Sequence, residues 1–454
     1  MSIPPTQTTS FASEAKELWT LSWPIATAQV ATMLMGVVDT LFAGPLGSEP
    51  LAALAIGNIS FFALFVLGAG TLRALDAHVS QAWGRDDPED AARGLAQGHW
   101  LALIVSVPVA LLILSVPRFL EFIHYDPALV EHARDYIAPL VWGVPGGILF
   151  SAYRSFLSGT NVTRPMIVAA VVANVVNLLL DWVLIDGKLG APALGVTGIA
   201  WATSVCRWVL FGVLLLASRW HPAYRGFPSR LRAPDPALIL RLAALGLPIG
   251  VTIFAEVSAF AGTGVLMGLK GAEPLAAHQV ALNAAALFFM VPLGLSSGAA
   301  VRCGQARGAN DVEAIARAGW TAYGVVVVWA ALSATAIGLL RGPIAAAYGV
   351  DGEVLSLAVT FLGVAALFQL GDCIQVMGNG VLRGLGDTRL PMVFTLLGYG
   401  GIALPFGWFG AFVLGDDPIW LWYGLTLGLA LVGALTLARF AWQLKRLRSE
   451  LPAK

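Results

Sequence analysis

Residues 81–93 read QAWGRDDPEDAAR, and residues 305–317, which lie 224 positions later, read QARGANDVEAIAR. The two segments share glutamine, glycine, aspartate, glutamate and a closing arginine in register. Three further pairs of segments repeat at this offset or at 225: GSEPLAA (47–53) with GAEPLAA (271–277), LSWPIA (21–26) with ALGLPI in the register that aligns Pro24 with Pro248, and FLSGTNVTR (156–164) with VLRGLGDTR (381–389). We interpret the chain as two homologous halves joined in tandem.

The composition places these halves in a membrane. The 454 residues are 57% hydrophobic and 12% charged, whereas an ordinary globular domain is about 25% charged. Apolar runs of roughly 20 residues recur along the chain, and each is long enough to cross ~30 Å of hydrocarbon as a helix. They predict an all-α integral membrane protein with twelve transmembrane helices near 18–44, 52–75, 95–117, 134–157, 165–185, 194–219, 242–267, 275–300, 316–340, 356–383, 391–414 and 419–442.

The repeat divides the twelve helices into two pseudo-symmetric six-helix lobes. Because six is an even number, both halves enter the membrane from the same side, and the repeats are parallel. The expected organisation is a cytoplasmic N-terminal tail at 1–17, an N-lobe at 18–219, a cytoplasmic linker at 220–236, a C-lobe at 237–442 and a cytoplasmic C-terminal tail at 443–454. Most Lys and Arg residues fall on the side of both termini, which predicts cytoplasmic termini in a multi-pass protein of the cell inner membrane.

Four carboxylates lie within the predicted spans: Asp39, Asp181, Glu256 and Asp372. Each costs on the order of 2.5–3.5 kcal/mol at the centre of a helix in a bilayer, which favours a functional role. The structural alternative is pairing with an arginine or capping of a broken helix. Arg207 is the one basic residue well inside a span, and it can neutralise at most one or two of the four.

The carboxylates of the N-lobe lie among other polar side chains. Asp181 shares a helical face with Asn174 and Asn177 at i, i+3 and i+7 spacing. Asp39 lies on a polar stripe of the first helix, and it is expected at a similar depth to Asp181. Carboxylate and amide oxygens at one depth predict an oxygen-rich pocket for a proton or Na⁺.

The carboxylates of the C-lobe are expected near mid-membrane. Asp372 shares a helical face with Gln369, Gln375 and Asn379, and Glu256 lies on the seventh span. A carboxylate of this kind can hold a proton, Na⁺ or an organic cation, but only one at a time. Because binding of one cation excludes the others, such a site can couple the transport of an ion to the transport of a substrate, as an ion-coupled carrier requires.

Several motifs together resemble the multidrug and toxic compound extrusion (MATE) transporters. They are VVDTLFAG (37–44), AEVSAFAGTGVLMG (255–268), PLAAHQVALN (274–283), GQARGA (304–309) and GNGVLRGLGDTRLPM (378–392), and the resemblance is greatest to the norfloxacin-exporter (NorM-type) branch. It implies an N-lobe site for a cation or proton made of Asp39, Asn177, Asp181 and Thr203, and a C-lobe site for a cation or substrate made of Glu256 and Asp372. Some relatives place a tyrosine one turn before the second C-lobe acid, where this chain has Phe368.

Further polar and aromatic residues are candidates for lining a substrate cavity. They are Gln29, Thr32, Asn174, His278, Gln279, Asn283, Phe368, Gln369 and Gln375. His278 belongs to one of the family motifs, but a lone histidine is more often a packed residue than a proton donor.

The resemblance implies a MATE-type fold and a secondary active multidrug efflux antiporter. It would exchange H⁺ or Na⁺ for small organic, mostly cationic, compounds by alternating access of two lobes and would confer drug resistance. The alternative is a flippase for lipid-linked saccharides, which would need basic residues where this chain has acids. No H-E-x-x-H or G-x-S-x-G motif lies in a span, so an enzyme is not expected. We expect a monomer in the lipid bilayer, without a cofactor, without a metal beyond Na⁺, and with no nucleic-acid partner. The coupling ion, the substrates and the resting state stay open.

Overall fold

The computed structural model describes residues 10–224 and 232–450, and nearly all of this part of the chain is helical. The α-helices are α1 (Phe11–Ala43), α2 (Ser48–Thr71), α3 (Ala74–Gly84), α4 (Pro88–Phe122), α5 (Pro127–Trp142), α6 (Val144–Gly159), α7 (Arg164–Leu184), α8 (Val196–Trp220), α9 (Pro236–Lys270), α10 (Ala272–Gly308), α11 (Val312–Ala347), α12 (Gly352–Gly384), α13 (Arg389–Thr395), α14 (Leu404–Phe409) and α15 (Ile419–Ser449). Short 3₁₀ turns lie at Gly44–Leu46, Lys188–Gly190 and Pro222–Tyr224, and π-helical turns at Leu396–Ala403 and Gly410–Leu414.

The described residues contain 11 helices long and apolar enough to cross a membrane, or up to 12 if a bent pair is one span. The bent pair is α5 and α6, which meet at 45° and occupy the expected fourth span. The prediction of an all-helical membrane protein is therefore confirmed. Helical structure extends into both expected tails, because α1 begins at Phe11 and α15 continues to Ser449. Residues 1–9, 225–231 and 451–454 of the expected tails and linker lie outside the described residues.

The internal repeat is visible in the backbone. Asp87 and Asp311, which are 224 positions apart, each begin a helix by accepting a hydrogen bond of 2.9 Å from the amide three residues later. This is the ordinary N-cap interaction of an aspartate. Left-handed residues recur at equivalent positions: Asp86 with Asn310, His124 with Gly349, and Asn161 with Gly386. The two halves therefore share their turn geometry as well as their sequence motifs.

The chain forms two compact units whose boundaries lie inside two long helices. Unit 1 is Thr27–Gly250, and unit 2 contains the described start of α1 up to Ala26 together with the chain from Val251 onward. Each boundary lies two residues after a proline within a helix, Pro24 in α1 and Pro248 in α9. The units divide the chain differently from the expected lobes, because residues 18–26 belong to unit 2 and residues 237–250 to unit 1.

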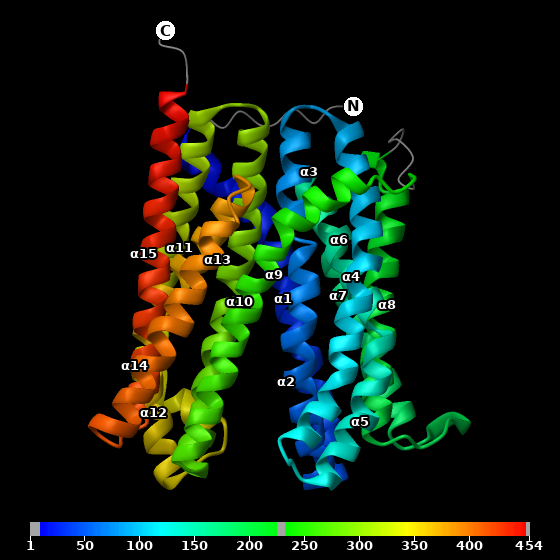
Figure 1. Cartoon of the computed structure of the whole chain (residues 1–454), viewed down its shortest axis with the longest axis vertical. Helices are drawn as coiled ribbons and strands as arrows, with labels where there is room; N and C mark the ends of the chain where they lie inside the picture. Colours follow the sequence, from blue (N-terminus) through cyan, green and yellow to red (C-terminus); the bar gives the residue numbers. More distant parts are fainter. Residues whose placement is uncertain (1–9, 225–231, 451–454) are drawn as a thin grey trace. The chain divides into compact units, whose positions relative to one another are not determined.

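In unit 1, α4, α6, α7 and α8 lie alongside one another (Figure 1). The first half of α9 packs closely on α2, since a Cβ atom at Gly246 would lie 1.9 Å from the carbonyl oxygen of Thr71. Only glycine permits this approach of two backbones. The chain just before α9 is also fixed to α4, because Gln97 donates to the carbonyl of Ala233 (3.0 Å) and accepts from the amide of Asp235 (2.7 Å).

In unit 2, the first half of α1 packs on α10 in the equivalent way. A Cβ atom at Gly294 would lie 2.8 Å from the backbone nitrogen of Ala26. Arg302 of α10 also donates two hydrogen bonds to Glu14 of α1, from Nε at 2.7 Å and from Nη2 at 2.8 Å. Glu14 is buried. Glycine contact and a buried ion pair thus explain why the start of α1 belongs to the second unit.

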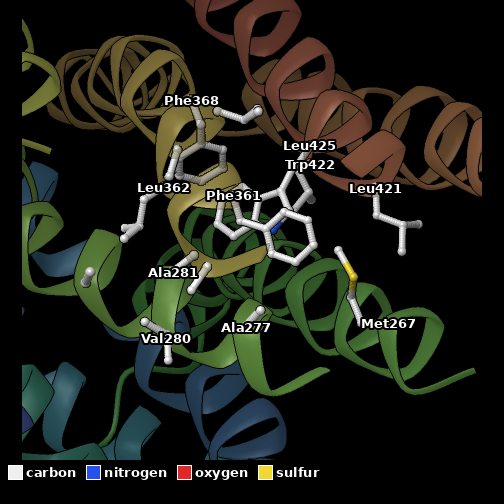
Figure 2. Packing of buried hydrophobic residues seen from close by; sticks show 14 of the residues in the cluster. Met267, Ala277, Val280, Ala281, Phe361, Leu362, Phe368, Leu421, Trp422 and Leu425 are labelled. Carbon is white, nitrogen blue, oxygen red and sulfur yellow. The ribbon is translucent and has the colours of Figure 1, made fainter. Parts of the chain in front are cut away.

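Aromatic side chains form the core of unit 2 around α12 and α15. Figure 2 shows Phe361, Phe368 and Trp422 side by side. The ring centroid of Trp422 lies 6.3 Å from that of Phe361 and 5.7 Å from that of Phe368. His278 of α10 packs on the same Trp422 at 5.5 Å. This core fixes the face of α12 that carries Asp372.

Candidate functional site

In unit 1, the predicted N-lobe residues are brought together around Asp39. The carboxylate of Asp39 accepts a hydrogen bond from Nδ2 of Asn177 at 3.0 Å and another from Oγ1 of Thr203 at 3.1 Å. Three helices therefore meet at one carboxylate: α1 provides the acid, α7 the amide and α8 the hydroxyl. Asp39 and Asn177 are buried, so these hydrogen bonds are shielded from water.

Asp181 lies one helical turn after Asn177 on α7 and faces the same place. It is fully buried, and neither of its carboxylate oxygens has a hydrogen-bond partner among the described residues. Its carboxyl group is close enough to that of Asp39 for the two to interact directly. Two ionised carboxylates can only accept hydrogen bonds. A bond between them therefore requires one proton, or a cation that contacts both.

Arg207 lies one turn after Thr203 on α8, at the edge of this site. The guanidinium carbon of Arg207 lies 4.1 Å from the ring centroid of Phe61 and 5.3 Å from that of Phe65, both on α2. Its Nη1 atom has no hydrogen-bond partner among the described residues. Aromatic faces attract a cation through their quadrupole. The guanidinium is thus held mainly by rings, and its positive charge acts on Asp39 from a distance.

In unit 2, Glu256 of α9 and Asp372 of α12 are close enough for their charges to interact. Asp372 is buried, and its Oδ1 atom has no hydrogen-bond partner within the described chain. Gln369 and Gln375, at i−3 and i+3, lie on the same face of α12 and are fully buried. Both polar atoms of the Gln369 amide and Nε2 of Gln375 have no partner in the described part of the structure. Buried polar atoms are normally paired, so this face is suited to a polar ligand or ordered water.

Tyr399 contributes to this face and was not among the residues predicted from sequence. It lies in the π-helical segment Leu396–Ala403, and its hydroxyl donates a hydrogen bond of 2.9 Å to Oε1 of Gln375. Its ring packs on Phe260, one turn after Glu256, at 6.1 Å between centroids. Tyr399 is the only tyrosine in the predicted span 391–414, but helical periodicity does not place it on the face of Asp372.

The other predicted residues have more varied surroundings. Gln29 accepts a hydrogen bond of 3.5 Å from Arg154, and Asn174 donates to the carbonyl of Ala31 at 2.9 Å. Thr32 donates to the carbonyl four residues earlier in its own helix. Gln279 and Asn283 are exposed, whereas His278, Phe368, Gln369 and Gln375 are buried. The part that these residues play in a cavity stays a prediction.

Comparison with known proteins agrees with this arrangement. A family model, MatE, matches residues 24–183 and 248–409. The chain belongs to the MatE family. The multidrug resistance protein MdtK of Yersinia pseudotuberculosis serotype O:1b (strain IP 31758) is 34% identical over 448 residues, which cover 95% of this chain and 96% of that protein. MdtK of Yersinia enterocolitica serotype O:8 / biotype 1B is 34% identical over 444 residues, with the same coverage.

Solved structures show that the MatE chain has the fold of this transporter class. The crystal structure of the eukaryotic MATE transporter AtDTX14 matches with a TM-score of 0.87 at 21% identity, over 97% of this chain and 99% of that one. An outward-facing multidrug resistance MATE family transporter matches with a TM-score of 0.85 at 19% identity, over 96% and 97%. The predictions of family and fold class, a membrane transporter of the MATE type, are therefore confirmed.

Proposed function

We propose that this MatE protein is a secondary active multidrug efflux antiporter of the cell inner membrane. It exchanges H⁺ or Na⁺ for small organic compounds, mostly cations, by alternating access, and it works as a monomer without a cofactor. The MdtK relatives, which are named multidrug resistance proteins, support export of drugs. Both termini face the cytoplasm in this proposal, in agreement with the Lys and Arg distribution of the sequence.

One observation carries the proposal: each unit contains two carboxyl groups within membrane helices that act on each other electrostatically, and one member of each pair, Asp181 or Asp372, has a buried oxygen without a hydrogen-bond donor among the described residues. In unit 1 the pair is Asp39 and Asp181, and in unit 2 it is Glu256 and Asp372. Structural carboxylates in a membrane are normally paired with a cation or with donors. Carboxyl groups that lack such partners are suited to bind and release an ion during a transport cycle.

The flippase alternative is disfavoured by the sign of these charges. A lipid-linked saccharide carries a pyrophosphate, which requires arginine or lysine side chains. Here the interacting pairs are acidic in both units, and Arg207 is held on the rings of Phe61 and Phe65.

Reconstitution in proteoliposomes tests the function. Purified protein is incorporated into vesicles with a fluorescent cationic dye, such as ethidium, on one side and an imposed pH or Na⁺ gradient. We expect dye movement against its gradient while an ion gradient is present, and loss of that movement when an ionophore collapses the gradient. Movement that survives the collapse of both gradients would contradict the antiporter proposal.

A further inference from the structure

The fourth span of unit 1 is broken between α5 and α6, which meet at 45° around Gly143. Pro145, at the start of α6, explains the break, because its ring displaces the carbonyl four residues earlier and it has no backbone N–H. The amide of Gly143 bonds to the carbonyl of Leu140, three residues earlier, at 3.0 Å, whereas an α-helix would use the carbonyl of Pro139. A carbonyl freed in this way inside a membrane needs a donor from a neighbouring helix.

Two side chains of α8 supply such donors. The hydroxyl of Ser204 donates to the carbonyl of Pro139 at 2.7 Å, and the indole N–H of Trp208 donates to the carbonyl of Trp142 at 2.8 Å. Ser204 is buried, and a residue four positions later lies on the same face of a helix. Ser204 and Trp208, which we call the α8 clasp, therefore hold the last turn of α5 against one face of α8.

The backbone at the break is also fitted closely to α8. A Cβ atom at Gly143 would lie 2.9 Å from the Cα atom of Ser204, and one at Gly146 would lie 2.9 Å from Cδ2 of Trp208. Only glycine permits approaches as close as these. The hydrogen bonds of the α8 clasp are thus combined with a steric fit, and a movement of α5 and α6 at the break requires a movement of α8.

The same turn of α8 reaches the N-lobe site. Thr203, which directly precedes Ser204, donates to Asp39 at 3.1 Å. Cys206 donates to the carbonyl of Ala173 on α7 at 3.3 Å. The six residues 203–208 therefore bond to α1, α5 and α7 at once. Hydrogen bonds weaken steeply with distance and misalignment, so a small shift of α8 is sufficient to break the bond between Thr203 and Asp39.

Unit 2 has neither the break nor the donors. The expected tenth span lies in α12 (Gly352–Gly384), which is one continuous helix. At the repeat offsets of 224 and 225, the positions equivalent to the α8 clasp are Gly428, Val432, Leu429 and Gly433. These four side chains contain no hydrogen-bond donor. The donors are thus present in the unit whose span is broken and absent at the equivalent positions of the other.

We propose that Ser204 and Trp208 are positioning residues of the N-lobe site: by holding the broken fourth span on α8, they keep the hydroxyl of Thr203 within hydrogen-bond distance of Asp39. The inference rests on the proposed antiport function and deepens it by naming residues, remote from the carboxylates, on which the geometry of this site depends.

A double-mutant cycle tests whether the α8 clasp acts through Thr203. Ser204→Ala, Trp208→Phe and Thr203→Val are each measured for kcat and KM of dye transport in proteoliposomes. We expect each substitution to lower kcat roughly fivefold, the loss typical of one interhelical hydrogen bond in a membrane, and to change KM by less than about twofold. In the Thr203→Val background, Ser204→Ala should cause no further loss, because the hydroxyl that it positions is absent.

The matched control is Ser218→Ala. Ser218 is a buried serine of the same helix, and its hydroxyl donates to the carbonyl of Leu215 within α8 at 2.8 Å, so its removal should leave kcat unchanged. Gly143→Ala removes no polar group but forces α8 away from the break, and it should reproduce the effect of Ser204→Ala. Should Ser204→Ala not be obtained as folded protein, Trp208→Phe combined with Thr203→Val completes the cycle, since Trp208 is partly exposed.

Hydrogen–deuterium exchange in detergent provides a readout that does not depend on transport. Peptides that cover residues 36–43, around Asp39, should exchange faster in Ser204→Ala and in Trp208→Phe than in the wild type, and at the wild-type rate in Ser218→Ala. This measurement follows the bond of α8 to α1 itself.

The outcomes separate the inference from the function. Losses in kcat that multiply in the Ser204→Ala, Thr203→Val double variant contradict the inference, because the clasp would then act independently of Thr203. Unchanged kcat in both Ser204→Ala and Trp208→Phe also overturns it, while the antiport function stands. A wild-type protein that moves no dye under either gradient contradicts the function, and exchange around Asp39 then decides the inference alone: faster exchange supports it, and unchanged exchange refutes it.

Discussion

Asn177 donates a hydrogen bond of 3.0 Å to Asp39, although the two residues are 138 positions apart in the chain. The second oxygen of Asp39 is occupied by the hydroxyl of Thr203. The aspartate thus holds three helices together, and it also lies beside Asp181, whose carboxylate oxygens accept no hydrogen bond from the described residues. The structure therefore supports both a packing role and an ion-coupling role, and mutation can distinguish them.

Asp39→Asn is expected to bind a cationic dye but to lose at least tenfold in turnover, because the amide cannot take up and release the coupling ion. Dye binding in this variant should also lose its dependence on pH. The measurement is vesicle transport under a fixed ion gradient, together with melting in detergent. Thr40→Val is the control, since Thr40 is exposed and its hydroxyl donates to the carbonyl of Gly36 in its own helix. Normal turnover with reduced stability would assign Asp39 to packing.

Glu256→Gln and Asp372→Asn should each severely reduce or abolish dye export while the protein stays inserted in the membrane. The amides keep the size of the side chains and remove the exchangeable charge. Efflux from cells and the amount of protein in the membrane are measured together. Glu273→Gln, an exposed acid of α10 in the same unit, should have no effect. Near-normal efflux by the double variant would refute the C-lobe assignment.

Arg207→Gln should shift the pH profile of transport to higher pH by about one unit, whereas Arg207→Lys should stay close to the wild type. Charges ~8 Å apart in a medium of effective dielectric constant ~20 interact by about 2 kcal/mol. The positive charge of Arg207 therefore favours the ionised form of Asp39. The measurement is initial efflux rate against pH in proteoliposomes. Identical profiles for both variants would show that the arginine serves packing on Phe61 and Phe65 alone.

Glu14→Gln is expected to lower the free energy of unfolding by about 3 kcal/mol, because it leaves the charge of Arg302 without its buried partner. Thermal denaturation in detergent reports the change. Glu450→Gln provides the comparison, since the pair of Glu450 with Arg446 is exposed and such pairs contribute about 0.3–0.5 kcal/mol. Equal effects of the two substitutions would argue against a structural role for the start of α1.

Asp235→Asn is expected to change stability only above about pH 4. The hydrogen bond from Arg93, and then that from the amide of Leu238, hold the pKa of Asp235 below its usual value of 3.8. A lowered carboxyl pKa stabilises the folded state above the unfolded pKa, and this stabilisation disappears as the pH falls through the folded pKa. Melting temperatures of both proteins, measured from pH 7 down to 3, should therefore differ at neutral pH and converge in acid. A difference that persists at pH 3 would show that the charge is not responsible.

The repeat, the helices and the shared face of Asn177 and Asp181 could be predicted because each leaves a local pattern. Asn177 and Asp181 are one helical turn apart, so their shared face follows from helix geometry alone. Thr203 was assigned to the N-lobe site from the family resemblance and not from spacing, and the structure shows its hydrogen bond to Asp39. Its geometry is now described, while its part in ion binding stays a prediction.

Two features of the structure left no such pattern. The assignment of the first half of α1 to unit 2 could not be predicted, because helices that are apolar all round carry no stripe that selects one neighbour over another. The second is the hydrogen bond from Tyr399 to Gln375, since Tyr399 lies in the π-helical segment Leu396–Ala403. The face of a residue in such a segment does not follow from a period of 3.6.

The pairing of Glu14 with Arg302 also constrains biosynthesis. The two residues are 288 positions apart, and translation proceeds at about 5–20 residues per second. The first helix therefore emerges from the ribosome roughly 15–60 s before its ionic partner exists. During this interval Glu14 and the helix that carries it lie beside the translocon or in the bilayer without the residues that later bury them. The second unit therefore folds fully only when the segment synthesised first packs against helices synthesised much later.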